Sequence, residues 1–397
     1  MGVPDMNKRS KMKTIKLMNK IAKVGTDIFD RDIYEVSDTA ENPDAIMVRS
    51  AALHEMEIPA NLKAIARCGA GVNNIPVEKC TENGVVVFNT PGANANGVKE
   101  LAVCALVLAA RDVVGGIEWA KTLQGNENVA KAVEAGKGAY VGNELIGKTL
   151  GVIGLGAIGG MVANAANALG MKVIGCDPYL TPAAAWNLAP SIKQAASFEE
   201  IFKSCDYISI HVPATPQTKN MICEKTISMM KDGVRIINLA RADLVCAADI
   251  KKALLDKKVA RYVTDFPTND TVGAEGIVNI PHLGASTFES EDNCAIMAAN
   301  QLVEFLANGN IKNSVNFPNV AIPASANARI CVMHKNASDM LTKITAAFAD
   351  ANVSVANLAN GAKGDNAYTI VEVADNASDA VVNAIATIDG VIRVVCY

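Results

Sequence analysis

No segment limits the possible folds of this chain as strongly as TLGVIGLGAIGGMVANAANALGMKVIGCD, residues 149–177. Gly154, Gly156 and Gly159 stand in GxGxxG spacing between an apolar run of strand length and a longer run of small and apolar residues. A second apolar run follows and ends in an acid, Asp177. Strand, glycine-rich turn, helix and acid-ending strand are the first elements of a doubly wound parallel sheet. The segment therefore predicts an α/β domain.

Each residue of this motif has a physical task in binding a dinucleotide. Gly154 permits the tight turn, Gly156 lets the backbone approach a pyrophosphate, and Gly159 allows the helix to pack close to the strand. The helix N-terminus offers unpaired N–H groups and a partial positive charge to the diphosphate. Asp177 can accept hydrogen bonds from both ribose hydroxyls, and no Arg follows it directly. The motif therefore predicts NAD as the cofactor; a purely structural glycine turn is the alternative.

Apolar runs of strand length recur before and after this motif. DAIMVRS, LKAIARCGAG and GVVVFNT alternate with helical runs in the first 90 residues, and DYISIHVP, VRIINLA, RYVTDFP and GIVNIPH follow the motif. Between the two sets, residues 96–121 predict one long helical segment that is buried in its middle. Continuous apolar strands separated by helices are typical of parallel sheets covered on both faces. We expect two flavodoxin- or Rossmann-like parallel-sheet domains in this chain of 397 residues.

The composition excludes several classes of protein. Half of the residues are hydrophobic and one fifth are charged, so the chain can form a large packed core. The net charge of −4 argues against a nucleic-acid or anionic-membrane partner. No uncharged apolar run is long enough to predict a membrane span, and residues 1–11 are expected to be a disordered extension without a secretory signal. Ten cysteines without a CxxC pair predict no metal site and a reducing cytoplasm.

Three polar segments follow apolar strands, where an open α/β sheet places its ligands. INLARADLV presents Arg241, YVTDFPTND presents Asp265 and Asp270, and IPHLGAS presents His282. An Arg can hold a carboxylate bidentately. A His, with an ordinary pKa of about 6.5, can move a hydroxyl proton near neutral pH. With NAD beside them, these residues predict hydride transfer to or from a 2-hydroxy acid.

These segments, in this order, resemble the D-isomer-specific 2-hydroxyacid dehydrogenases, and most closely the phosphoglycerate dehydrogenases among them. HVPATPQT (211–218), INLARADLV and PHLGAS carry the resemblance in the cofactor half, and VRSA (48–51), RCGAGVNNIP (67–76) and NTPGANANGVKEL (89–101) carry it in the substrate half. The resemblance runs from about residue 14 to the C-terminus. It implies a substrate-binding domain of residues 1–92 and 283–320, an NAD-binding Rossmann domain of residues 93–282, a linker at 321–326 and a C-terminal domain at 327–397.

The resemblance also implies roles for single residues. Arg241 would bind the substrate carboxylate and His282 would be the acid–base. The residues that would contact NAD are Ala70, Gly154, Gly156, Ala157, Ile158, Gly159, Asp177, Val212, Leu239, Ala240, Arg241, Asp265, His282, Leu283, Gly284 and Ala285. Those that would contact the substrate are Arg49, Arg67, Gly71, Asn73 and Arg241. Arg49 and Arg67 are candidates for its phosphate and carboxylate, with a surface ion pair as the alternative for each.

One position departs from the family pattern. Members carry a Glu that charges and orients the histidine, a few residues after the Asp of a DxF segment. Here the same offset lands on Asp270, whose side chain is one methylene shorter than that of Glu. Glu275 is the other candidate, because the loop is also shorter than in most relatives. We expect Asp270 to be the partner of His282.

Residues 327–397 have a pattern of their own. Their apolar and helical runs follow the order βαββαβ, which is the ferredoxin-like α+β plan, and they resemble an ACT domain, an amino-acid-binding regulatory module. The resemblance implies an L-serine effector site at His334, Asn336 and Ser354. Relatives have Pro-Gly where this chain has Ser338 and Asp339, and the charge of Asp339 would repel an arriving carboxylate. A dimerisation module that pairs its edge strands is therefore the alternative.

The resemblance as a whole implies the NAD-dependent oxidation of 3-phosphoglycerate to 3-phosphohydroxypyruvate by a cytoplasmic homodimer or homotetramer. One alternative keeps the chemistry but uses glyoxylate, hydroxypyruvate or D-lactate. Another is a non-catalytic sensor of NAD or of an amino acid. Only the missing Glu favours the sensor, since a sensor needs neither Arg241 nor His282.

Overall fold

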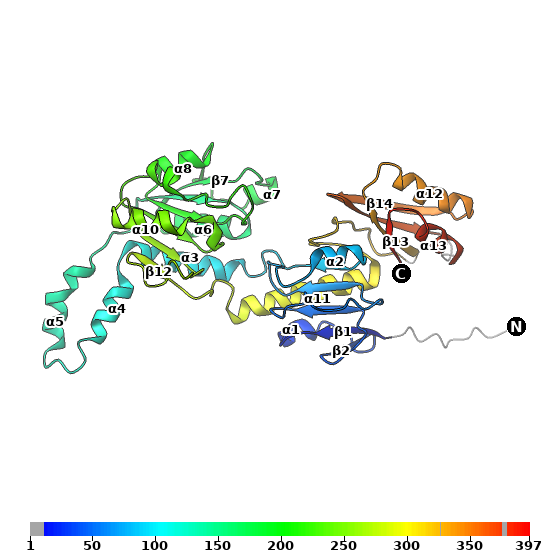
Figure 1. The fold of residues 1–397 in the computed structure, drawn as a ribbon, viewed down its shortest axis with the longest axis horizontal. Helices are drawn as coiled ribbons and strands as arrows, with labels where there is room; N and C mark the ends of the chain where they lie inside the picture. The colour runs from blue at the N-terminus through cyan, green and yellow to red at the C-terminus, as the bar shows by residue number, and fades with distance from the viewer. Residues whose placement is uncertain (1–11, 326, 375–378) are drawn as a thin grey trace. The chain divides into compact units, whose positions relative to one another are not determined.

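The glycine-rich motif folds into β6 (Thr149–Ile153), α6 (Ala157–Ala168) and β7 (Lys172–Cys176). The computed structural model describes residues 12–325, 327–374 and 379–397 (Figure 1). The chain divides into two units, one of Ala95–Ser290 and one of Met1–Asn94 with Glu291–Tyr397. The chain therefore returns to the second of these units after Ser290, which is later than the expected boundary after residue 282. The extension predicted at residues 1–11 lies outside the described residues.

The unit of Ala95–Ser290 contains a seven-stranded sheet in the order β12-β11-β10-β9-β6-β7-β8. All its neighbouring strands are parallel, as predicted. The sequence analysis did not predict β8, which has only two residues. Besides β6 and β7, the strands are β8 (Lys193–Gln194), β9 (Tyr207–Ile210), β10 (Val234–Asn238), β11 (Val259–Thr264) and β12 (Ile277–Asn279).

Helices cover both faces of this sheet. On one face, α3 (Ala95–Ala110) and α6 pack against alternate side chains of the central strands. On the other face, α8 (Phe198–Ser204), α9 (Glu224–Ser228) and α10 (Ala247–Leu255) do the same. The strands read as continuous apolar runs because both of their faces are buried. Two short elements, α7 (Pro182–Ala185) and the 3₁₀ turn η2 (Ala242–Leu244), complete the connections.

The long helical segment predicted at residues 96–121 is interrupted, and that prediction was wrong in part. α3 ends at Ala110 and α4 (Val113–Lys121) begins anew, with the Asp112 side chain accepting a hydrogen bond from the Gly115 N–H at 3.1 Å. Asp112 also pairs with Arg261 at 2.8 Å, which holds this break in place. α3 is buried in its own unit, whereas α4, α5 (Val129–Gly136) and the 3₁₀ turn η1 (Lys137–Tyr140) bury no residue. Figure 1 shows α4 and α5 as a hairpin apart from the sheet.

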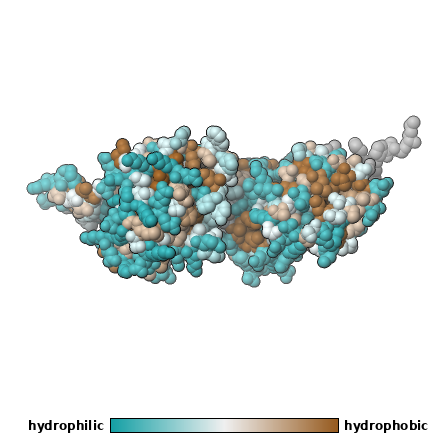
Figure 2. Space-filling model, turned by 90° about the horizontal axis from the view of Figure 1, so that it is seen from above, coloured by the Kyte–Doolittle hydropathy of each residue, from teal (hydrophilic) through white to brown (hydrophobic). Residues whose placement is uncertain are grey.

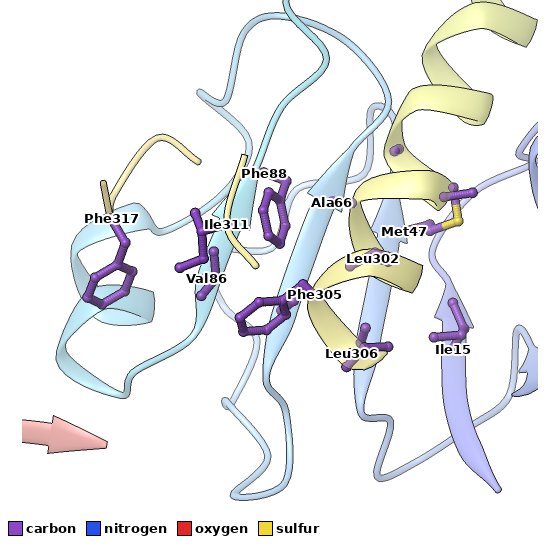
Figure 3. Close-up of a cluster of buried hydrophobic side chains, with 14 of the residues drawn as sticks. Ile15, Met47, Ala66, Val86, Phe88, Leu302, Phe305, Leu306, Ile311 and Phe317 are labelled. Carbon is purple, nitrogen blue, oxygen red and sulfur yellow. The ribbon is translucent and has the colours of Figure 1, made fainter. Parts of the chain in front are cut away.

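The other unit begins with a five-stranded parallel sheet in the order β2-β1-β3-β4-β5. Its elements are β1 (Lys13–Leu17), α1 (Lys23–Thr26), β2 (Tyr34–Ser37), β3 (Ala45–Val48), β4 (Ala64–Arg67), α2 (Val77–Glu82) and β5 (Val86–Phe88). α11 (Phe288–Asn308) returns to this sheet and packs on one face through Leu302, Phe305 and Leu306, as Figure 3 shows. The opposite face is covered by α2 and the loops around Leu53 and Leu62.

The C-terminal segment of this unit forms a four-stranded antiparallel sheet. Its elements follow the predicted βαββαβ order: β13 (Ala328–Lys335), α12 (Met340–Asp350), β14 (Val355–Lys363), β15 (Asn366–Val373), α13 (Asp379–Ala386) and β16 (Val391–Cys396). The spatial order is β14-β15-β13-β16. α12 and α13 cover one face. The other face contributes Cys331, Met333, Tyr368 and Ile370 to the same core as Phe305 and Phe317, so this sheet and the five-stranded sheet share one hydrophobic core.

Hydrophilic residues cover much of the face shown in Figure 2, with hydrophobic ones in patches between them. Among the described residues, no helix is both long and apolar enough to cross a membrane. All ten cysteines are free, and six of them are buried. Their role in the fold is that of small apolar side chains.

Candidate active site

The three glycines of the motif meet different surroundings. Gly154 has φ +87°, and a Cβ there would lie 2.6 Å from the carbonyl oxygen of His211. A Cβ at Gly159 would lie 1.9 Å from the carbonyl oxygen of Gly154, so any side chain would force helix and turn apart. Gly156, directly before Ala157 and Ile158 at the start of α6, has no atom within 4 Å of the Cβ position. The turn thus needs Gly154 and Gly159 for packing and leaves open space at Gly156.

The backbone orients the Asp177 carboxylate at the end of β7. Its two oxygens accept hydrogen bonds from the N–H groups of Leu155 (2.9 Å) and Tyr179 (2.8 Å). The carboxylate therefore lies against the glycine-rich turn, where a ribose bound over the turn would meet it. Val212 follows β9 beside the same turn, since its side chain lies 2.9 Å from the Cβ position of Gly154.

Arg241 is held at the end of β10 by a buried amide. The Asn238 side-chain oxygen accepts hydrogen bonds from the N–H groups of Ala240 (3.1 Å) and Arg241 (3.4 Å), and its Nδ2 donates to the Arg241 carbonyl at 2.8 Å. Leu239 between them is buried. The Arg241 guanidinium is exposed and donates only to its neighbouring carbonyl, that of Ala240, within the part of the chain that the structure describes. A fixed backbone with an exposed guanidinium is suited to binding an anion.

Asp265, at the end of β11, is the buried carboxylate of this region, with 1% of its surface exposed. Its Oδ2 accepts a hydrogen bond from the Gly284 N–H at 3.2 Å, and its Oδ1 has no hydrogen-bond partner among the described residues. Burial raises the pKa of Asp265, while the Gly284 hydrogen bond and the charges of His282 and Arg241 act in the opposite direction. A buried carboxylate with an unused oxygen can accept a hydrogen bond from a ligand or a neighbouring ring.

Phe266 lies near both expected catalytic side chains. Its ring centroid is 4.5 Å from that of His282 and 5.6 Å from the Arg241 guanidinium carbon. Sequence reasoning missed this residue, although its place directly after Asp265 in the DFP segment was a usable signal. Leu283 and Ala285, on the loop after His282, flank the Gly284 N–H that holds Asp265. The structure thus brings Arg241, Asp265, Phe266 and His282 together at the carboxyl ends of β10, β11 and β12.

The structure does not bring Asp270 to His282. The Asp270 side chain is 74% exposed, and its contact is with the Lys251 ammonium at 4.0 Å. Glu275 is also exposed and lines a pocket with Leu254 and Arg261. In the loop after Phe266, Thr268 and the buried Thr271 hydrogen-bond each other on either side of the exposed Asp270. The buried carboxylate in the same region as His282 is that of Asp265.

The predicted substrate residues of the other unit lie on loops after β3 and β4. Arg49 follows β3 and forms an ion pair with Glu291 of α11, with Nη2 and Oε1 2.6 Å apart. Arg67 ends β4, and a Cβ at Gly69 would lie 1.5 Å from its Nη1, so the guanidinium occupies the space that this glycine leaves. The Ala70 carbonyl accepts a hydrogen bond from Asn89 at 2.7 Å. Gly71 is half-buried, and Asn73 is exposed.

The three expected effector residues differ in their burial and in their hydrogen bonds. The His334 ring is buried, with Nδ1 2.8 Å from the Lys335 carbonyl and Nε2 2.9 Å from the Thr369 hydroxyl. Asn336 donates to the Gly364 carbonyl at 3.1 Å, and Ser354 is exposed. In this arrangement both ring nitrogens of His334 are used within the fold.

Comparison with known proteins finds similarity over most of the chain. Residues 113–288 match the family model described as D-isomer specific 2-hydroxyacid dehydrogenase, NAD binding domain. A D-3-phosphoglycerate dehydrogenase of Haemophilus influenzae is 31% identical over 352 residues, which are 85% of this chain and 82% of the relative. One of Bacillus subtilis is 33% identical over 301 residues, or 74% of this chain and 55% of the relative. The chain thus spans about half the length of several curated relatives.

Solved structures agree with the fold. A 3-phosphoglycerate dehydrogenase of Entamoeba histolytica with bound NAD⁺ has 27% sequence identity and a TM-score of 0.61, covering 77% of this chain and 99% of its own. A D-mandelate dehydrogenase of Rhodotorula graminis, 21% identical with a TM-score of 0.66, covers 79% of this chain and 100% of its own. Because the sequence identity is only 21%, the similarity to the D-mandelate dehydrogenase supports the fold alone.

Proposed function

This chain belongs to the D-isomer specific 2-hydroxyacid dehydrogenase family, and from that premise we propose that it oxidises 3-phospho-D-glycerate to 3-phosphohydroxypyruvate with NAD, the first step of serine biosynthesis. The observation that carries the proposal is the cluster of Arg241, Asp265, Phe266 and His282. All four side chains lie at strand ends of the unit that holds the glycine-rich turn. A cation, a proton carrier and a buried carboxylate are the groups that oxidation of a 2-hydroxy acid requires.

The residues of the turn fit NAD. Gly156 leaves room for a pyrophosphate, the first N–H groups of α6 have no side-chain cap, and Asp177 is oriented by the backbone. The unused Oδ1 of Asp265 fits an amide donor such as that of a nicotinamide. When bound, NAD supplies the acceptor for the hydride that leaves C2 of the substrate.

In this proposal Arg241 binds the substrate carboxylate with its exposed guanidinium and aligns the C2 hydroxyl. His282 takes the hydroxyl proton on a ring nitrogen as the C2–O bond becomes a carbonyl. The resulting positive charge on His282 is stabilised by the Asp265 carboxylate, which takes the role that the sequence assigned to Asp270. Phe266 holds the His282 and Arg241 side chains at a fixed separation by contacting both. In the reductive direction the same ring returns the proton.

The phosphorylated substrate is supported by the relatives named above and by two cations, Arg49 directly after β3 and Arg67 at the end of β4. As the resemblance implies, Arg49 and Arg67 are the proposed contacts for an anionic group at the far end of the substrate. An unphosphorylated acid such as hydroxypyruvate or glyoxylate is the second candidate, because Glu291 already neutralises Arg49.

We assign the C-terminal sheet to the ACT class on its element order and its β14-β15-β13-β16 arrangement. L-serine is the effector to test: Ser354 is exposed, whereas Asn336 donates to the Gly364 carbonyl and His334 is engaged in the fold. A homodimer or homotetramer in the cytoplasm accords with the exposed apolar residues of the α4–α5 hairpin, such as Val114 and Ile117, and with ten free cysteines.

The experiment is NADH consumption by the purified chain with 3-phosphohydroxypyruvate, hydroxypyruvate and glyoxylate, each with and without L-serine. We expect preference for the phosphorylated acid. His282→Ala should slow turnover roughly a hundredfold or more, while NADH affinity, measured by fluorescence titration, stays unchanged. Equal loss of turnover and NADH binding would refute the acid–base assignment.

Two carboxamide variants separate the candidate carboxylates. Asp265→Asn should lower turnover at saturating substrate and change its pH profile, because the charge that favours protonated His282 is removed. Asp270→Asn should leave both nearly unchanged, since its side chain points to Lys251 and solvent. The reverse result would restore Asp270 as the partner.

A further inference from the structure

We infer that Glu291 is a specificity-determining residue, which weakens the binding of a doubly charged distal group by holding the Arg49 guanidinium in an ion pair. The inference rests on the proposed function, because it takes Arg49 as a contact for the far end of the substrate. The geometry behind it is the 2.6 Å separation between Arg49 Nη2 and Glu291 Oε1. Both side chains are about two-fifths exposed, so a small anion can reach the pair.

The loop that carries Arg49 does not need Glu291 to keep its shape. The Asn19 side-chain oxygen accepts hydrogen bonds from three consecutive N–H groups, those of Arg49 (3.2 Å), Ser50 (3.1 Å) and Ala51 (2.9 Å). The Asn74 amide donates to the carbonyl of Ala51 at 2.8 Å. The side-chain amides of Asn19 and Asn74 therefore hold the loop backbone. The Glu291 carboxylate contributes a negative charge beside Arg49 and is not needed to fix the backbone.

Two thiols, those of Cys68 and Cys294, indicate which charges share this region. Arg49 and Arg67 both act on the thiols of Cys68 and Cys294: burial raises the pKa of each thiol, to about 12 for Cys68, and the two guanidinium charges oppose the increase. The two cations therefore lie in one region, and Glu291 acts on the Cys294 thiol as well.

The consequence differs between substrates. A phosphate must either displace the Glu291 carboxylate from Arg49 or bind beside it against like-charge repulsion, whereas a neutral hydroxymethyl group meets neither cost. The competing explanation for Glu291 is structural. An acidic side chain in the first turn of a helix such as α11 interacts favourably with the helix dipole. Glu289 lies in the same turn and forms no ion pair among the described residues, so it provides a matched control.

The test is Glu291→Gln, which keeps an acceptor oxygen for Arg49 and removes the charge. We expect the KM for 3-phosphohydroxypyruvate to fall roughly three- to tenfold, with kcat and the KM for hydroxypyruvate unchanged. Glu289→Gln should move none of these values. In an Arg49→Ala background, Glu291→Gln should lose most of its effect, because no guanidinium remains to be released.

A binding measurement separates this inference from the proposed function. The dissociation constants of 3-phosphoglycerate and glycerate are measured by calorimetry for the NAD-loaded wild type and for Glu291→Gln. Tighter binding of the phosphorylated ligand alone supports the role of Glu291, even if the wild type turns over only unphosphorylated acids and the proposed substrate fails. Unchanged or weaker binding of 3-phosphoglycerate to Glu291→Gln overturns the inference, because Glu291 would then be neutral or a support for Arg49.

Discussion

At the scale of single residues, histidine is the most informative side chain in this protein. His282 is exposed beside Arg241 and Phe266, where it can exchange a proton with a ligand. His211 directly follows β9 and lies against the glycine-rich turn, with its Nε2 2.8 Å from the Ser209 hydroxyl. Burial lowers the pKa of His211 to about 4. The His282 ring is positioned to exchange a proton with a ligand, whereas the His211 ring is neutral and packs within the fold.

The low pKa of His211 predicts acid sensitivity of the fold. Below the ordinary value of 6.5 the unfolded chain binds a proton at this ring, but the folded chain does not until the pH approaches 4. Stability should therefore fall as the pH falls through this window, by on the order of 3 kcal/mol for this group. The melting temperatures of wild type and His211→Gln at pH 7.5 and pH 5 measure it, and the variant should lose less on acidification.

His54→Gln is the matched control for that comparison, because the His54 ring is exposed. Burial also lowers the pKa of His334, so part of the acid sensitivity should persist in His211→Gln. If wild type and His211→Gln lose the same stability between the two pH values, His211 does not titrate as inferred.

At the scale of elements, the β6–α6 turn combines two demands in one short segment. Gly154 and Gly159 are needed because their Cβ positions are filled by backbone oxygens at 2.6 and 1.9 Å. Gly156 has no atom near its Cβ position. The lack of a side chain at Gly156 is therefore important only when a ligand occupies that space. The same spacing therefore serves folding at two positions and ligand binding at the third.

Two alanine substitutions should separate these demands. Gly159→Ala should lower the free energy of unfolding by about 2 kcal/mol or more, because helix and turn must move apart. Gly156→Ala should leave the melting temperature nearly unchanged and weaken NADH binding by tenfold or more, since the methyl group occupies the expected pyrophosphate space. Thermal unfolding and NADH fluorescence titration read the two effects independently. Wild-type NADH affinity in Gly156→Ala would contradict the assignment of that space.

At the scale of the whole molecule, the C-terminal sheet is joined to its unit by more than apolar packing. Arg329 on β13 pairs with Glu372 on β15, and both side chains are at least 95% buried. The Arg329 guanidinium also donates to the carbonyls of Asn308 (2.9 Å) and Ile322 (3.2 Å), at the end of α11 and in the following segment. Burial acts to raise the pKa of Glu372, but hydrogen bonds from Ser325 and Arg329 lower it overall.

Removing one member of this pair should therefore be costly. Glu372→Gln leaves the Arg329 charge buried without its counter-ion, and we expect a loss of about 3–5 kcal/mol in the free energy of unfolding. The double variant Arg329→Met/Glu372→Leu should lose less than the single one, because no uncompensated charge remains. Urea unfolding measures both. Glu224→Gln, which breaks the exposed pair with Lys252, should leave the midpoint almost unchanged and serves as control.

Local patterns were sufficient to predict much of this protein. The strands of the seven-stranded sheet, the GxGxxG turn and the βαββαβ order of the C-terminal segment all follow from spacing that is visible over a few residues. The reason is physical: a strand buried on both faces must be apolar throughout, and a left-handed turn such as that at Gly154 admits little but glycine. The same locality placed Arg241, Asp265 and His282 at strand ends, where parallel strands bring them to one edge.

Contacts between distant segments could not be read in this way. Sequence spacing favoured Asp270 as the partner of His282, but the Asp270 side chain is exposed and contacts Lys251, and the buried carboxylate near the ring is that of Asp265. The contacts of Phe266 with His282 and Arg241, and the ion pair of Glu291 with Arg49, were likewise not predicted. Which side chains meet across a loop, or from opposite ends of a chain, depends on where folding brings their backbones. Residue types and spacing therefore determined the elements and the cofactor class, whereas packing selected the charges that face each other.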